Sequence, residues 1–393
     1  MTYDLTIVQQ LAILLFAALI AYLIFTKINQ SIIIGEILLG IIIGPSLLGL
    51  VTYTPFIQSI AMLGAILLLF SVGFEFKMKD VYNLRFFIIA LIGVIIPFIT
   101  GFYFAQFLTY DFMTSFFLAT TLTATSIAIT ANVLKELGKL HTEPARAIIG
   151  AAVIDDVLGL IILSFAIQVK AGDISPVKIG IILASVAAFF IVGILLGRPI
   201  VKWLIEHLEQ TSIGKKHVEA VLILAFVIAF FFSATAELIG LSAIVGAFLA
   251  GITMEGVKVR DEADFRRGAD HVQMIFAPVF FISLGILIDF HQLTIDIIWF
   301  VLALTVLAFL TKLLGCYLGA RLGRMGNKNA FIVGIGMAPR GEVAMIVALI
   351  GLQAAVISQE IYTAVIIMSL LTTLFVPLIF RYLSFPEEKQ EPS

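Results

Sequence analysis

The stretch "IIGAAVIDDVLGLIILSFAI" at residues 148–167 places two adjacent aspartates, Asp155 and Asp156, in the middle of a run with no other charged residue. An apolar run of about 20 residues has the length that a membrane-spanning helix needs. One charge at the centre of such a helix costs about 2.5–3.5 kcal/mol on insertion scales. The sequence therefore predicts a membrane helix whose two carboxylates have a buried partner or a function.

The composition places the whole chain in the membrane class. Of its 393 residues, 61% are hydrophobic and 13% are charged, whereas a soluble domain is about half apolar and a quarter charged. The net charge of −2 gives no reason to expect a nucleic-acid partner. The single cysteine, Cys316, lies in an apolar run and predicts a buried structural thiol.

The apolar windows predict about 13 transmembrane helices and no alternating strands, so the expected fold class is all-α integral membrane. Two of the expected spans cover residues 31–50 and 240–254. The first span begins near the N-terminus without the basic segment of a secretory signal. Residues 384–393 form a short polar tail.

Lys and Arg predict the orientation. With the N-terminus outside, the inside segments hold 20 basic residues and the outside loops hold Lys170 and Lys178. The two remaining basic residues, Lys312 and Arg340, lie within spans. This asymmetry predicts a cytoplasmic C-terminus.

Two pairs of similar segments predict an internal repeat. "LLFSVGFEFKMKDV" (68–81) resembles "FFISLGILIDFHQL" (280–293), and "GEILLGIIIGP" (35–45) resembles "LSAIVGAFLAG" (241–251). Spans 1–6 would then repeat as spans 8–13, and a single connecting span would give them opposite orientations. Inverted-topology repeats of this kind are common in secondary transporters. Chance likeness between apolar segments is the alternative.

Two spans at matching positions of the halves contain helix-breaking residues. "TTLTATSIAIT" (120–130) is rich in hydroxyl side chains, and "GIGMAPRGEVAMIV" (334–347) contains a proline between glycines. Interrupted helices in both halves point to a transport site. The hydroxyls of Thr125 and Ser126 suit a desolvated alkali cation, although a simple kink relieved by neighbouring helices is the alternative.

The charges within spans predict an exchange site. Adjacent helical residues point about 100° apart, so one aspartate can pair with Lys312 while the other faces a water-filled cavity. A cation and a proton would compete for that second carboxylate. The alternative is a purely structural Asp155–Lys312 bridge, which leaves Asp156 unexplained.

Other features of the spans have structural interpretations. We expect Arg340 and Glu342 to neutralise the ends of the second interrupted helix and to stabilise the core. Glu36 lies near the end of span 2 and can reach the interface. The spacings Gly40–Gly44 and Gly246–Ala250 predict close helix packing.

Together these motifs resemble the monovalent cation:proton antiporters of the second cation/proton antiporter group, the NapA-like sodium/proton antiporters. The resemblance rests on "GEILLGIIIGPSLLG" (35–49), "LLLFSVGFEFK" (67–77), "TATSIAIT" (123–130), "IDDVLG" (154–159), Lys312 and "GMAPRGEVAMIVA" (336–348).

The resemblance implies a NapA/NhaA-like fold with two crossed interrupted helices. It implies panel or dimerisation helices, mobile core ion-transport helices, a linking helix and a cytoplasmic tail. In chain order we place the first panel at 1–80, the first core helices at 81–170, the linker at 171–210, the second panel at 211–292, the second core helices at 293–383 and the tail at 384–393. By position, Asp156 looks like the carboxylate that binds Na⁺ or K⁺ and protons, and Asp155 looks like the partner of Lys312, with Thr125 and Ser126 where the unwound segments cross.

The expected function is an alternating-access sodium/proton antiporter in the plasma membrane, electrogenic because the paired aspartates and lysine are similar to the electrogenic members. We expect a homodimer in the lipid bilayer, no cofactor and no enzymatic activity. The alternatives are a potassium/proton antiporter, a sodium-coupled organic anion symporter and a cation channel. Hydroxyl and carboxylate ligands suit Na⁺ and K⁺ alike, so the sequence leaves the cation open.

Overall fold

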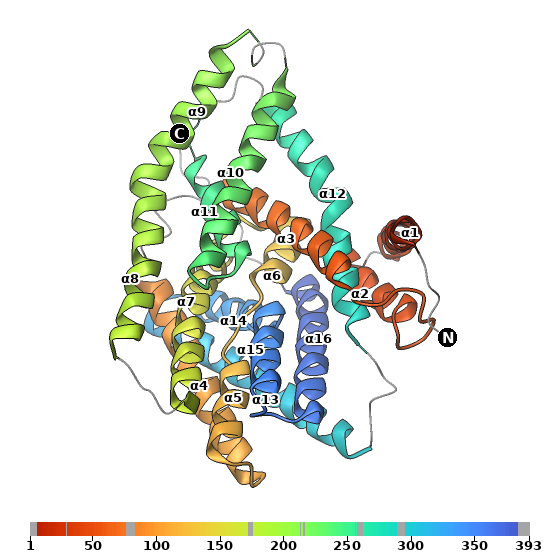
Figure 1. The fold of residues 1–393 in the computed structure, drawn as a ribbon, viewed down its shortest axis with the longest axis vertical. Coiled ribbons are helices and arrows are strands. Elements are labelled where there is room, and N and C mark those ends of the chain that lie inside the picture. Colours follow the sequence, from red (N-terminus) through yellow and green to blue (C-terminus); the bar gives the residue numbers. More distant parts are fainter. Residues whose placement is uncertain are drawn as a thin grey trace. The chain divides into compact units, whose positions relative to one another are not determined.

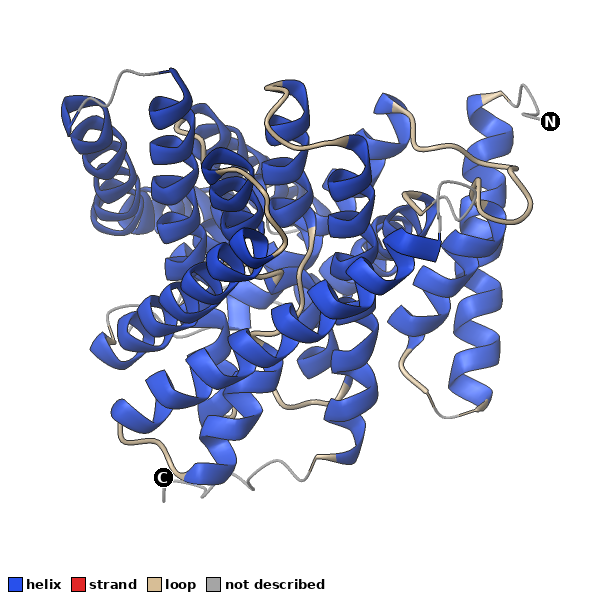
Figure 2. Cartoon of the chain, turned by 90° about the horizontal axis from the view of Figure 1, so that it is seen from below, coloured by secondary structure: helices blue, strands red, loops and turns tan. Residues whose placement is uncertain are grey.

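In the computed structural model every regular element of the described residues is a helix (Figures 1 and 2). The structure describes residues 6–28, 30–75, 83–171, 176–212, 214, 217–255, 257, 262–288 and 295–383. Within them, eight helices are long and apolar enough to cross a membrane. The all-α membrane class is thus confirmed for the described part, while the count of about 13 spans stays a prediction. The expected tail at 384–393 lies outside the described residues.

The chain divides into two compact units. The first unit is Met1–Lys79 with Gly180–Asp289, and the second is Asp80–Ile179 with Phe290–Ser393. The first unit contains α1 (Ile7–Lys27), α2 (Ile32–Ile43), α3 (Pro55–Glu75), α9 (Arg198–Gln210), α10 (Val218–Leu238), α11 (Ala243–Thr253) and α12 (Glu262–Ile286). The second contains α4 (Leu84–Phe107), α5 (Phe112–Thr121), α6 (Ile127–Glu136), α7 (Glu143–Ala171), α13 (Ile295–Leu322), α14 (Asn327–Gly336), α15 (Glu342–Gln353) and α16 (Gln359–Tyr382). The chain passes between the units within α8 (Pro176–Val192).

Glycines allow α2 and α12 of the first unit to approach at backbone distance. A Cβ atom on Gly40 would lie 2.1 Å from the carbonyl oxygen of Ile282, and one on Gly285 would lie 2.1 Å from that of Ile37. Both distances are far below van der Waals contact, so neither position accepts a side chain without a shift of the helices. The predicted packing role of Gly40 is confirmed. Gly44 likewise lies against Ile286.

The contact between α3 and α11 has the same arrangement, in which a glycine of each helix faces a carbonyl oxygen of the other. A Cβ on Gly73 would lie 2.2 Å from the carbonyl oxygen of Phe248, and one on Gly251 would lie 2.3 Å from that of Phe70. Gly246 of α11 packs in the same way against the backbone of Phe232 on α10, at 2.4 Å. The α2–α12 and α3–α11 contacts are therefore a matched pair.

These matched contacts change the register of the proposed repeat. They relate Gly40 to Gly251 and Gly73 to Gly285, which are 211 and 212 positions apart. On that register "GEILLG" (35–40) corresponds to "GAFLAG" (246–251), so the pairing of 35–45 with 241–251 is five positions out of step. Apolar side chains can replace one another in a membrane helix, whereas a glycine that packs against a backbone cannot be replaced. We therefore align the two segments by their glycines.

Two helices are shorter than the sequence predicts. α2 has 12 residues and α11 has 11, which at 1.5 Å per residue is well short of a hydrocarbon core of about 30 Å. α2 ends where Gly44 precedes Pro45, because proline disfavours a helical conformation in the residue before it. Gly240, in the left-handed region at φ 85°, precedes the start of α11.

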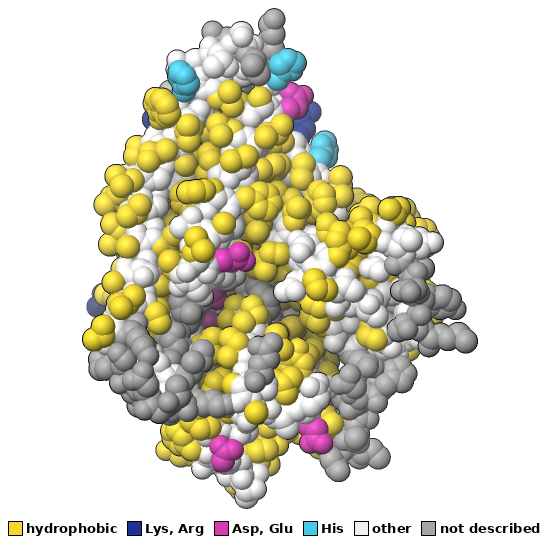
Figure 3. Space-filling view, in the orientation of Figure 1, with side chains coloured by type: hydrophobic (Ala, Val, Ile, Leu, Met, Phe, Trp, Pro, Cys, Tyr) yellow, Lys and Arg dark blue, Asp and Glu magenta, His cyan; other side chains and the backbone are white. Residues whose placement is uncertain are grey.

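The continuous helix that includes α8 and α9 contains a π-helical turn and has an apolar surface. Residues Gly193–Gly197 form a π-helical segment between α8 and α9, within a continuous apolar helix of 31 residues from Gly180 to Gln210. Leu195 and Leu196 expose 65% and 57% of their surface. Figure 3 shows hydrophobic side chains over much of the visible face. Exposed apolar surface of this extent is what lipid contact requires.

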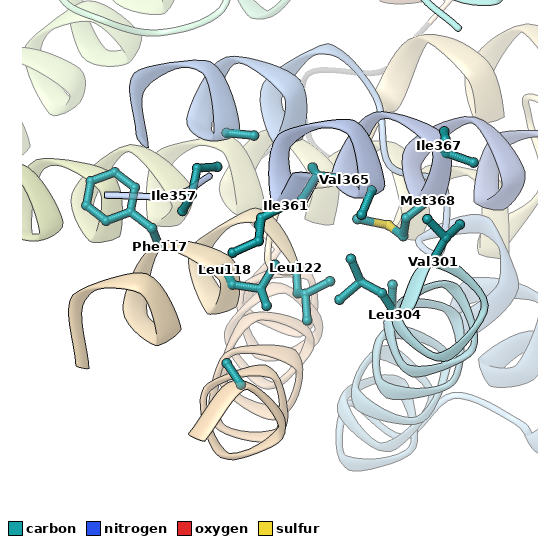
Figure 4. Close-up of a cluster of buried hydrophobic side chains, with 14 of the residues drawn as sticks. Phe117, Leu118, Leu122, Val301, Leu304, Ile357, Ile361, Val365, Ile367 and Met368 are labelled. Carbon is teal, nitrogen blue, oxygen red and sulfur yellow. The ribbon is translucent and has the colours of Figure 1, made fainter. Parts of the chain in front are cut away.

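The second unit has its own core, formed by α5, α13 and α16. Figure 4 shows Leu118 and Leu122 in one cluster with Leu304 and Met368. All four side chains are at most 1% exposed. This core supports the two short helix pairs that form the candidate site.

We expect Gly40→Ala to destabilise the protein by about 1–3 kcal/mol, the usual cost of overpacking a tight contact. Gly180→Ala is the matched control, because a Cβ there meets nothing within 4 Å and alanine favours a helix over glycine by about 0.5–1 kcal/mol. Thermal unfolding of the detergent-purified variants measures both. Equal melting temperatures for the two variants would contradict the packing assigned to Gly40.

Candidate functional site

Two helices of the second unit are interrupted. α5 ends at Thr121 and α6 begins at Ile127, while α14 ends at Gly336 and α15 begins at Glu342. Both interruptions fall within the stretches 120–130 and 334–347 that the sequence singles out. In each case the backbone of about five residues leaves the helical ladder and needs other partners.

The two unwound segments supply partners to each other. The backbone N–H of Ser126 donates to the carbonyl oxygen of Pro339 at 2.9 Å. The Thr130 hydroxyl donates to the carbonyl oxygen of Gly336 at 2.7 Å. Direct contact between the breaks explains why unwound backbone is tolerated in a membrane protein, because it is buried against protein rather than lipid.

Gly341 is required where the segments meet. A Cβ atom at this position would lie 2.6 Å from both the Cβ and the Oγ of Ser126. The sequence predicts Gly341 as a helix breaker, and the structure gives it a second role as the space into which Ser126 fits.

Lys312 of α13 forms a salt bridge with Asp155 of α7. Its ammonium donates to Asp155 Oδ1 at 2.6 Å and to the carbonyl oxygen of Thr123 at 2.6 Å. Both charged side chains are fully buried. The carbonyl is available only because Thr123 lies in the first break, outside the helical hydrogen-bond ladder. A buried ion pair needs such additional hydrogen bonds to offset its desolvation.

The two adjacent aspartates, which a helix places about 100° apart, are both buried. Asp155 is 1% exposed and Asp156 is 9% exposed. The Thr125 hydroxyl donates to the carbonyl oxygen of Met337 in the second break at 3.3 Å.

Arg340 ties the second break to three neighbours. Its Nη1 donates to the carbonyl oxygen of Ala124 and its Nη2 donates to that of Ala308 at 3.0 Å. Its backbone N–H donates to Thr372 Oγ1 at 3.1 Å, and its carbonyl accepts from Thr373 Oγ1 at 2.8 Å. The fully buried guanidinium therefore connects the first break with α13, and the backbone of Arg340 connects to α16.

The remaining expected residues have less direct relations to this centre. Ser126 is fully buried at the contact between the breaks. Glu342 begins α15, and its side chain lies outside the described part of the structure. Glu36 belongs to the first unit and is 4% exposed, so the expectation that it reaches the interface is wrong. It lies in α2, which packs on α1 and α12.

Several site groups carry no signal in the sequence. The acceptors for the two buried cations are the backbone carbonyls of Thr123, Ala124 and Ala308, and a carbonyl is present at every residue. Thr372 and Thr373 stand out only as a polar pair in the apolar run "SLLTTLFV". Two carbonyls of the first break are thus held by the protein's own cations.

Cys316 is a buried thiol one helical turn after Lys312, as the sequence predicts. A Cβ on Gly93 of α4 would lie 2.4 Å from its sulfur and 3.8 Å from Cε of Lys312. Gly93 therefore makes room for the face of α13 that carries the lysine.

Comparison with known proteins identifies the family. Residues 14–384 match the profile of the transmembrane sodium/hydrogen exchangers. The chain belongs to the sodium/hydrogen exchanger family. The resemblance found in the sequence is thereby confirmed, and the protein is a multi-pass membrane transporter rather than an enzyme.

Individual members of the family are similar over most of the chain. The Na(+)/H(+)-K(+) antiporter GerN of Bacillus cereus is 35% identical over 83% of this chain and 83% of its own length. The Na(+)/H(+) antiporter of Enterococcus hirae is 34% identical over 83% and 84%. The sodium proton antiporter MjNhaP1 of Methanocaldococcus jannaschii has the same fold, with a TM-score of 0.68 at 19% identity over 94% of each chain.

We expect Asp155→Asn to cost about 3–5 kcal/mol of stability, because it leaves the Lys312 ammonium buried without its counter-charge. Lys312→Met should be destabilising for the same reason. The double variant should regain much of the loss, since it buries no charge at this pair. Melting temperatures of the four proteins in one detergent complete the cycle, and simple additivity of the two single effects would contradict a direct pair.

Proposed function

We propose that this exchanger is a secondary active sodium/proton antiporter. The observation that carries the proposal is a buried carboxylate pair with a lysine, located where two interrupted helices meet. Membership in the sodium/hydrogen exchanger family supports it, as do relatives named Na(+)/H(+) antiporters.

Asp156 is the proposed binding carboxylate for Na⁺ and for the proton. It is adjacent to the Asp155–Lys312 pair and is the more exposed of the two aspartates. A bound cation favours the ionised carboxylate and a bound proton excludes the cation, so the two compete for one group. Thr125 and Ser126 contribute the nearby oxygens. Arg340 and Glu342 have a supporting role at the second break.

Lys312 is the proposed link between Na⁺ binding and a second proton. Its ammonium already occupies two oxygen ligands, Asp155 Oδ1 and Thr123 O, of the kind that an alkali cation uses. A sodium ion that displaces the ammonium from these oxygens removes the interaction that keeps the lysine charged, and Lys312 then releases a proton. Two protons exchanged for one sodium ion make the cycle electrogenic. At 100 mV one net charge supplies about 2.3 kcal/mol, which is roughly a fifty-fold gradient.

The proposed architecture assigns transport to the second unit and dimerisation to the first. Core helices at 81–170 and 293–383 carry the site past panel helices at 1–80 and 211–292, with the linker at 171–210. The inverted repeat and the NapA/NhaA-like arrangement belong to this proposal, and the matched glycine contacts of the first unit support the repeat. The transporter is placed in the plasma membrane as a homodimer, with the N-terminus outside and the C-terminus in the cytoplasm.

A potassium/proton antiporter is the second candidate. One specific observation favours it, because the relative from Bacillus cereus with 35% identity is named a Na(+)/H(+)-K(+) antiporter. The hydroxyl, carboxylate and carbonyl oxygens of the site suit either ion.

Exchange in proteoliposomes at clamped voltage, with Na⁺, K⁺ and Li⁺ compared, tests the function. We expect Na⁺-driven proton movement that Asp156→Asn reduces to background, since an amide does not titrate and lacks the negative charge of a carboxylate. Asp111→Asn is the matched control, because Asp111 caps α5 outside the site and asparagine caps equally well. Asp156→Asn retaining pH-dependent Na⁺ uptake would overturn the role of this residue. Exchange with K⁺ and none with Na⁺ would select the second candidate.

The voltage dependence tests the role of Lys312 separately. We expect the double variant Asp155→Asn/Lys312→Met, which removes the buried pair together, to exchange one proton per sodium ion and to lose its response to membrane potential. Lys202→Met, an exposed lysine of α9 in the first unit, should keep the wild-type response. If the double variant transports with unchanged voltage dependence, Lys312 is not the carrier of the second proton.

A further inference from the structure

A cavity lies in the second unit, and Asp155, Lys312 and Arg340 are not among its lining residues. It has a volume of about 270 Å³, or about nine times the roughly 30 Å³ that one water occupies in the liquid. A group of five heavy atoms fits within it. It is lined by Asn83, Arg85, Phe86, Glu143, Arg146 and Met325.

Three helices begin at this cavity. Asn83 is the N-cap of α4, Glu143 is the first residue of α7, and Met325 lies two residues before Asn327, where α14 begins. Each helix N-terminus carries a partial positive charge of about half an elementary charge and N–H groups that lack helical acceptors. These partial charges have the same sign as the two arginines of the wall, whereas the C-terminal end of α13, at Leu322, lies three residues before Met325 and has the opposite sign.

Arginine side chains add full positive charges at this cavity. Arg85 and Arg146 line the cavity from α4 and α7. Arg321, in the last turn of α13, donates from Nη1 to the carbonyl oxygen of Met325 at 2.6 Å, and so covers an acceptor that would repel an anion. Two arginines in the wall and a third behind it form a site that favours a multiply charged anion.

Among the described residues that line the cavity, Glu143 is the single acidic one, and it behaves as an internal ligand. Its Oε2 accepts from Asn329 Nδ2 at 2.7 Å, and its Oε1 lies 3.9 Å from Arg85 Nη1. Both Glu143 and Arg85 have about half of their side-chain surface exposed, at 49% and 52%. A carboxylate held this loosely at the surface can give way to an anion that carries more charge and more acceptor oxygens.

We propose that this cavity binds a phosphate group, carried by a soluble phosphate compound or by an anionic lipid headgroup. A phosphate offers three or four acceptor oxygens, which match the forked donors of two arginines. The bound group would join the starts of α4, α7 and α14. Since α7 carries Asp155 and Asp156, and α14 leads into the second break, the ligand would stabilise the frame of the transport site. This site is independent of which cation is exchanged.

The test begins with inorganic phosphate and the detergent-purified full chain. We expect phosphate to raise the melting temperature above sodium chloride at the same ionic strength, since a ligand that binds only the folded state stabilises it. Arg146→Gln should weaken the apparent affinity at least ten-fold. Glu143→Gln should strengthen it several-fold, because it removes the competing carboxylate. Lys202→Gln, a basic residue of the first unit, is the control and should leave the affinity unchanged.

A second arm separates the sources of the phosphate. Vesicles of phosphatidylcholine alone are compared with vesicles that contain phosphatidic acid, by the melting temperature of the reconstituted protein. Stabilisation by phosphatidic acid that Arg146→Gln abolishes supports a headgroup site, and stabilisation by inorganic phosphate alone supports a soluble ligand. The proposal is overturned if chloride stabilises as well as phosphate, or if neither probe distinguishes wild type from Arg146→Gln. Weaker phosphate binding by the Glu143→Gln variant would also overturn the proposal. That result is expected if Glu143 only stabilises the cavity and does not compete with the anion.

Discussion

The buried ammonium of Lys312 is the constraint on which the candidate site depends. A fully buried lysine persists as a cation only if oxygens replace its water, and here Asp155 and the Thr123 carbonyl do so at 2.6 Å each. The carbonyl is available because the helix between α5 and α6 is interrupted. The interruption in turn is tolerated because the second break supplies the Pro339 carbonyl to the Ser126 N–H and buries the unwound backbone against protein. The ion pair and the two breaks are therefore one structure.

Arg340 shows the same principle with a charge that never changes. Its guanidinium binds the Ala124 carbonyl, next to the carbonyl that Lys312 binds. A cation entering the first break therefore meets oxygens that protein cations already hold. Lysine can yield its oxygens by losing a proton, whereas arginine stays protonated in proteins. This difference is the reason that we propose exchange for the lysine and a supporting role for the arginine.

Close packing between helix backbones is the second feature on which the fold depends. In the first unit, glycines on α2, α3, α11 and α12 allow carbonyl oxygens of the facing helix to approach within distances that a Cβ would occupy. In the second unit Gly341 admits Ser126, and Gly93 admits the Cys316 side of α13. Helices in lipid gain little from the hydrophobic effect when they associate, so surfaces that fit at backbone distance provide much of the attraction.

The sequence by itself determined the membrane class, the helical class, the positions of both helix breaks and the set of charges within spans. These features are local, because apolar length, proline, glycine and hydroxyl residues act on their own segment of chain. Only the tertiary structure decided the carbonyl partners of Lys312 and Arg340 and the burial of Glu36. It also decided the register of the matched helices and the convergence of three helix starts on one cavity. A backbone carbonyl has the same chemistry at every residue, so only the contact made across the fold selects the one that a buried cation uses.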